Sequence, residues 1–108
     1  MPDYTILPFS SAPRVPFNLD GRILFSSAEY ELVHLTLQPG EAMEPHIQPI
    51  PIVFFVAGGI GALSVGGEVI DISEHMTIHV KAGVARAWAN TGKEPLKILV
   101  NKLLAWSD

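Results

Sequence analysis

Apolar and polar residues alternate with a period of two along most of the chain. No window of helical length places apolar residues about 3.6 positions apart, and short alternating runs recur about every ten residues between glycine, proline, asparagine and aspartate. In residues 30–37, His34 and Thr36 alternate with Val33 and Leu35. This spacing predicts an all-β sandwich or barrel. The expected strands are residues 21–25, 30–37, 44–48, 53–56, 62–65, 68–72, 76–80, 85–90 and 96–103.

Glycine and proline give the expected strands their boundaries. Gly66-Gly67 between two alternating runs is a hairpin signal, because glycine tolerates the positive φ that a tight hairpin turn requires. Pro49 and Pro51 each remove a backbone donor, so the chain after 44–48 is expected to bend or to lie at a sheet edge. Residues 1–20 contain four prolines and are expected to form an extended arm that lies along the sheet or crosses to a second subunit.

Composition and charge exclude several classes of function. The net charge is −4, and the seven lysines and arginines form no cluster that would track a phosphate backbone, so nucleic acid is not an expected partner. The absence of cysteine excludes a disulfide framework and a thiolate nucleophile. No targeting segment or apolar run of about 20 residues is present. A cytoplasmic protein without membrane contact is expected.

One stretch carries a set of spaced glycine and polar residues. It consists of Gly40, His46, Gln48, Ile52 and Gly59. The spacing resembles the first motif of the cupin superfamily, in which a glycine is followed by His-x-His, a glutamate and a closing glycine. Gly40, His46 and Gly59 match, whereas Gln48 stands in place of the second histidine and Ile52 in place of the glutamate.

A second stretch resembles the second cupin motif. Gly83 and Asn90 match, while His75 stands in place of the first glycine, Lys81 in place of the proline and Arg86 in place of the histidine. The resemblance extends over more than half of the chain. It implies a single-domain double-stranded β-helix, or jelly-roll barrel, over residues 21–108, with a ligand pocket inside the barrel. It also implies a homodimer.

The resemblance implies a transition metal in relatives, but the residues here do not favour one. The ligand positions carry His46, Gln48, Ile52 and Arg86, and a catalytic metal needs about three protein ligands of suitable chemistry. We therefore expect no metal cofactor. The alternative is a divalent transition metal bound by His46 with relocated histidines, His79 or His34.

The replaced residues suggest a different kind of pocket. A buried Arg86 would require a partner, and a carboxylate or phosphate fits its planar fork, with His46 and Gln48 as further polar contacts. Trp88 shares its inward phase and is expected as a pocket wall or as core, and Phe54 has the same two interpretations. The open alternative for Arg86 is an exit to solvent. It would then pair with Glu41, Glu44 or Glu74.

The sequence therefore favours a small barrel that binds a small organic or anionic ligand in its interior. Two other functions remain open: a metal-dependent enzyme such as a dioxygenase or isomerase, and a structural or oligomerisation module. Asn90 before Thr-Gly is expected to fix a turn rather than to bind a ligand.

Overall fold

The computed structural model describes residues 3–105, and within them the chain is almost entirely strand and loop. This confirms the predicted all-β class. No helix in this part of the chain has the length and hydropathy needed to cross a membrane. The elements are a short 3-10 helix, η1 (Phe9–Ser11), and the strands β1 (Asp20–Ser26), β2 (Glu31–Leu37), β3 (Ile52–Gly58), β4 (Gly61–Val65), β5 (Glu68–Ile72), β6 (Thr77–Val80), β7 (Arg86–Ala89) and β8 (Leu96–Lys102).

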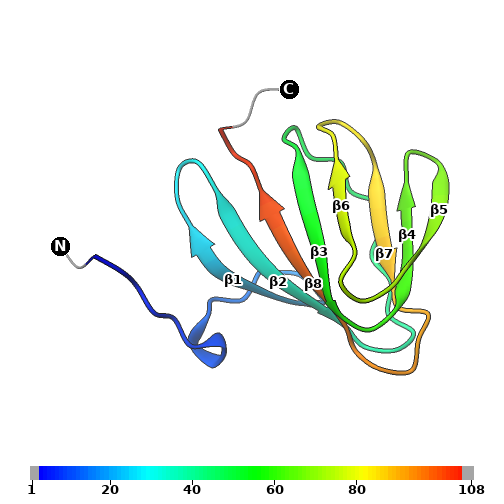
Figure 1. Cartoon of the computed structure of the whole chain (residues 1–108), viewed down its shortest axis with the longest axis horizontal. Coiled ribbons are helices and arrows are strands. Elements are labelled where there is room, and N and C mark those ends of the chain that lie inside the picture. Colours follow the sequence, from blue (N-terminus) through cyan, green and yellow to red (C-terminus); the bar gives the residue numbers. More distant parts are fainter. Residues whose placement is uncertain (1–2, 106–108) are drawn as a thin grey trace.

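The strands form two antiparallel sheets. One has the order β1-β2-β8-β3-β6 and the other β5-β4-β7. Figure 1 shows the smaller sheet beside the β6 end of the larger one, with the chain crossing between the sheets at the loops. The last strand, β8, lies between β2 and β3 and pairs with both. Strands distant in sequence therefore make the middle of the larger sheet.

The hairpin between β4 and β5 is confirmed. Val65 pairs with Glu68, which leaves Gly66 and Gly67 as the two turn residues. Their φ angles are 55° and 86°. Positive φ at both central positions is the type I′ geometry that matches the twist of a two-residue hairpin, and glycine adopts it without strain.

The expected strand at 44–48 is wrong. This segment runs beside β7 but makes only isolated bridges to it, at Ala42 and His46. Pro45 and Pro49 flank His46 and have no N–H to donate. A continuous ladder cannot form there, so the segment follows the outer edge of β7 as an irregular strip.

The core lies between the sheets, where each strand presents every second side chain. In β2 the inward residues are Val33, Leu35 and Leu37, as the alternation predicts, and in β7 they are Arg86 and Trp88. The fully buried side chains of the core are Leu37, Ile52, Val56, Leu63, Trp88, Leu96 and Ile98.

The second half of the expected arm folds back onto its own chain. The N–H of Val15 donates to the carbonyl of Gly21 at 2.8 Å, and the N–H of Ile23 donates to the carbonyl of Pro13 at 2.8 Å. These bonds cover the free edge of β1. A Cβ added at Gly21 would lie 2.7 Å from Cε1 of Phe17, so the absence of a side chain there allows the Phe17 ring to sit against β1.

The first part of the arm runs away from the sheets past β1 (Figure 1). It carries the exposed apolar residues Tyr4, Ile6 and Leu7, and it ends at Phe9, whose ring packs against His34 of β2. Residues 1 and 2 of the predicted arm lie outside the described residues, as do residues 106–108 of the predicted barrel domain. The homodimer stays a prediction.

Candidate functional site

A cavity of about 240 Å³ lies inside the barrel. Strands β2, β3 and β8 of the larger sheet form one wall, β7 of the smaller sheet forms the other, and two irregular segments around residues 15–17 and 43–48 complete it. Its surface is mostly apolar. The lining residues are Val15, Phe17, Val33, Leu35, Met43, His46, Gln48, Phe54, Arg86, Trp88, Val100 and Lys102.

The structure brings all five sequence-predicted site residues to this one cavity. His46 and Gln48 come from the irregular strip, Phe54 from β3, and Arg86 and Trp88 from β7. Their role in binding a ligand stays a prediction. The sequence interpretation did not include the remaining lining residues, among them the cation Lys102 and the arm residues Val15 and Phe17.

Arg86 is held by hydrogen bonds to His46, its bridge partner in the irregular strip. The N–H of Arg86 donates to the carbonyl of His46 at 2.9 Å, and the N–H of His46 donates to the carbonyl of Arg86 at 2.8 Å. The same His46 carbonyl also accepts a bond from Nη1 of Arg86 at 3.1 Å. The guanidinium carbon lies 5.8 Å from the centre of the Phe54 ring. One edge of the fork is therefore held, and the other has no protein acceptor among the described residues.

The charge of Arg86 is buried without a counterion. Only 8% of the residue is exposed, and no carboxylate of residues 3–105 lies within ion-pair distance. Burial lowers the pKa of the guanidinium, which nevertheless stays charged near neutral pH. A buried polar group without its full set of partners is costly. The guanidinium nitrogens that make no protein bond face the partly open cavity, where water or a ligand oxygen can accept from them.

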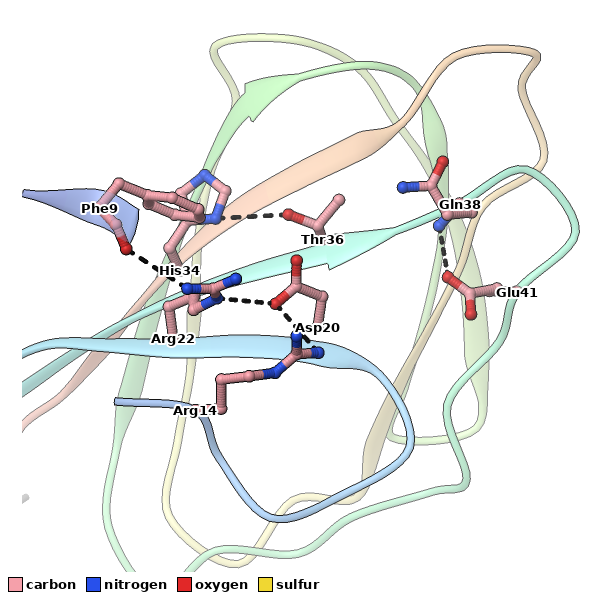
Figure 2. Close-up of polar contacts among 8 residues, drawn as sticks. All are labelled: Phe9, Arg14, Asp20, Arg22, His34, Thr36, Gln38 and Glu41. Atoms are coloured by element: carbon pink, nitrogen blue, oxygen red, sulfur yellow. Dashed lines mark hydrogen bonds and ion pairs between the residues drawn. The ribbon is translucent and has the colours of Figure 1, made fainter. Parts of the chain in front are cut away.

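The alternative in which Arg86 exits to solvent and pairs with an acidic residue is wrong. Glu41 accepts a bond from the backbone N–H of Gln38 at 2.5 Å (Figure 2). Glu74 lies 3.4 Å from His75. Glu44 makes no ion pair with Arg86 either.

Two aromatic rings form an edge-to-face pair beside Arg86. The centres of Phe54 and Trp88 are 5.3 Å apart at an interplanar angle of 78°. Trp88 is 1% exposed, and its Nε1 is a buried donor that finds no hydrogen-bond partner within residues 3–105. Both rings therefore belong to the core and also form part of the pocket wall. The two roles expected from the sequence, core and pocket wall, are compatible for both residues.

The other polar lining residues differ in whether they have a charged partner and in how exposed they are. Nζ of Lys102 lies 3.2 Å from Glu31, so this second cation already has a partner. His46 is exposed and Gln48 is half-buried. None of the aspartates and glutamates in the described part of the chain lines the cavity. Within that part, Arg86 is the lining cation whose charge is uncompensated.

His34 and His79 do not converge with His46, contrary to the alternative metal set. His34 lies between the inward residues of β2 and points to the outer face of the sheet, where its ring contacts Phe9 edge-on at 5.0 Å (Figure 2). Its Nδ1 is 3.5 Å from Oγ1 of Thr36. His79 is exposed on β6, between buried Val80 and half-buried Ile78.

Acidification is expected to destabilise the protein through His34. Its pKa is lowered from the ordinary 6.5, first by burial, then by the positive charge of Lys97, with Asp20 acting in the opposite sense. The unfolded chain then binds this proton more readily than the folded protein does. The contribution of His34 to the free energy of unfolding is complete above pH 6.5, which is its ordinary pKa. This contribution is lost as the pH falls from 6.5 toward the lower pKa in the folded protein.

Urea unfolding at pH about 7.5 and about 5 measures this effect. His34→Phe keeps an aromatic ring against Phe9 and has no proton to bind. The variant should therefore lose less stability on acidification than the wild type, and an equal loss in the two proteins would show that His34 does not contribute.

The residues at the cupin ligand positions do not fit a transition metal. Ile52 is a core residue with 1% exposure, and buried Arg86 places a positive charge where a metal would need a ligand. Within residues 3–105 no cluster of three or more histidine, cysteine or acidic side chains is placed to hold an ion.

Asn90 is a turn residue, as expected. Its Nδ2 donates to the carbonyls of Leu37 at 2.9 Å and Glu94 at 2.8 Å. Its Oδ1 accepts from the N–H of Gly92 at 2.9 Å. These bonds fix the end of β7, the strand that carries Arg86 and Trp88.

Comparison with known proteins gives a family model and several structures. The model described as "Cupin domain" matches residues 33–101. No curated protein matches the sequence. Similar structures include a predicted oxalate decarboxylase from Thermotoga maritima, with 17% identity, a TM-score of 0.81 and coverage of 93% of this chain and 99% of that chain.

Two further structures show the same likeness. A polyketide cyclase from Streptomyces resistomycificus has 12% identity and a TM-score of 0.81, over 94% of this chain and 80% of that one. A cupin domain from Schizosaccharomyces pombe has 15% identity and a TM-score of 0.75, over 82% of this chain and 69% of that one. At such low identities the likeness shows the fold.

Proposed function

The chain belongs to the cupin family, and from that premise we propose that it binds a small anionic ligand inside the barrel, without a catalytic metal. The observation that carries the proposal is the buried guanidinium of Arg86, which faces the cavity and has no counterion among the described residues. A carboxylate or a phosphate oxygen pair matches the free edge of its fork.

The expected attraction between the guanidinium of Arg86 and a bound anion is large enough to contribute to binding. A single negative charge about 4 Å from the guanidinium, at an effective dielectric of about 20, is attracted by roughly 4 kcal/mol. The anion would also supply acceptors to N–H groups that have none in the protein. His46 and Gln48 lie in the same lining and are proposed as additional polar contacts.

Small anions are expected to raise the thermal unfolding temperature of the wild type by several degrees when present at about a hundred times their Kd. The panel consists of acetate, benzoate, inorganic phosphate and sulfate at constant ionic strength. Arg86→Gln keeps a polar side chain, although a shorter one, and removes the charge, so the shift should disappear in this variant. An equal shift in both proteins would contradict the proposal.

Elemental analysis of the same preparation tests the alternative function, that of a metal-dependent enzyme. The protein is purified without chelator and then offered iron, manganese, nickel and zinc in turn. We expect fewer than about one metal ion per ten chains, because the site has no adequate ligand set. A content near one ion per chain would contradict the metal-free proposal.

A further inference from the structure

The charges of the lining residues indicate which net charge the ligand carries. Of the two lining residues with permanent positive charge among residues 3–105, Lys102 is paired with Glu31 at 3.2 Å, whereas Arg86 has no carboxylate partner in that range. One negative charge therefore balances the site. A second one would be buried against apolar side chains without a partner, which is unfavourable.

The lining residues also indicate the size and polarity of the uncharged part of the ligand, which is called its body below. Around the guanidinium the wall consists of aliphatic side chains from the larger sheet, Val33, Leu35 and Val100, and of the Phe54 and Trp88 rings. Pockets for drug-sized ligands have volumes of roughly 300–1,000 Å³. A partly open cavity of about 240 Å³ therefore suits a smaller ligand with few polar groups.

We propose that the ligand is a compact monocarboxylic acid with an apolar body, held through its carboxylate by Arg86. This inference rests on the proposed function and narrows it to a substrate class. The carboxylate lies against the free edge of the guanidinium, and the apolar body occupies the space between the aliphatic wall and the aromatic pair. Size and the single charge together exclude sugar phosphates and dicarboxylates as preferred ligands.

Four matched probes separate the contributions of charge and body. Benzoate carries both, benzamide has the same body without the charge, acetate has the charge without the body, and phenyl phosphate has the body with a larger charge. Calorimetric titration at constant ionic strength gives the Kd of each. We expect benzoate to bind at least tenfold more tightly than each of the other three.

Two variants assign the charge to Arg86. Arg86→Gln should weaken benzoate binding at least tenfold. The matched control is Arg14→Gln, which removes the same charge from an arginine whose side chain is 60% exposed and does not line the cavity. Benzoate binding to this control should stay within about threefold of the wild type. An equal loss in both variants would overturn the assignment.

The outcomes distinguish the inference from the proposed function. If acetate or phenyl phosphate binds as well as benzoate, and Arg86→Gln abolishes that binding, the anion site stands and the apolar monocarboxylate is wrong. If benzamide equals benzoate, the charge has no role and both fail. Both also fail if none of the four probes binds, or if all bind Arg86→Gln unchanged.

Discussion

Arg86→Met is expected to raise the free energy of unfolding of the ligand-free protein by about 1–3 kcal/mol and to abolish anion binding. Arg86 is 8% exposed and lies in a largely apolar cavity, and its charge has no carboxylate partner among residues 3–105. Methionine has a similar stem without that charge. The carbonyl of His46 keeps a donor in the variant, because the backbone N–H of residue 86 also bonds to it at 2.9 Å.

Urea unfolding in a buffer free of carboxylate and phosphate measures this stabilisation. Arg14→Met is the matched control, since the Arg14 side chain is 60% exposed and its ion pair with Asp20 is at the surface. The control should change stability by less than about 0.5 kcal/mol. A loss of stability in Arg86→Met would show that the guanidinium holds the barrel together rather than serving a ligand.

Asn90→Ala is expected to lower the free energy of unfolding by about 3 kcal/mol. Asn90 is 4% exposed, and its side chain makes three hydrogen bonds, to the backbones of Leu37, Glu94 and Gly92. Each bond contributes about 1 kcal/mol, and a buried group left without a partner costs more. Thr91→Ala changes the exposed neighbour and should be nearly neutral. A loss below about 1 kcal/mol in Asn90→Ala would contradict the structural role.

The alternation of residue types predicted the strands because each strand buries one face. Val33 and Leu35 show this in β2, and the same counting by two from the cupin motif placed Arg86 and Trp88 inside the barrel. Lys102 shared the inward phase of Val100 on β8, so a signal for it existed. It was missed because lysine at the end of a strand is usually solvated.

Other parts of the site left no signal in the sequence. Val15 and Phe17 come from a proline-rich arm without periodicity, and their position depends on the bare backbone of Gly21 in β1. His79, named as an alternative metal ligand, is exposed because the buried phase of β6 belongs to Val80. Such positions follow from long-range packing, which local patterns do not contain.

The place of β8 between β2 and β3 has a consequence for how the protein folds. The cavity needs Val100 and Lys102 from this strand together with Val15 and Phe17 from the opposite end of the chain. Pairings of such long sequence separation form slowly, because loop closure must precede them. During synthesis the pocket is incomplete until β8 has inserted. Ligand binding is therefore linked to global rather than local folding.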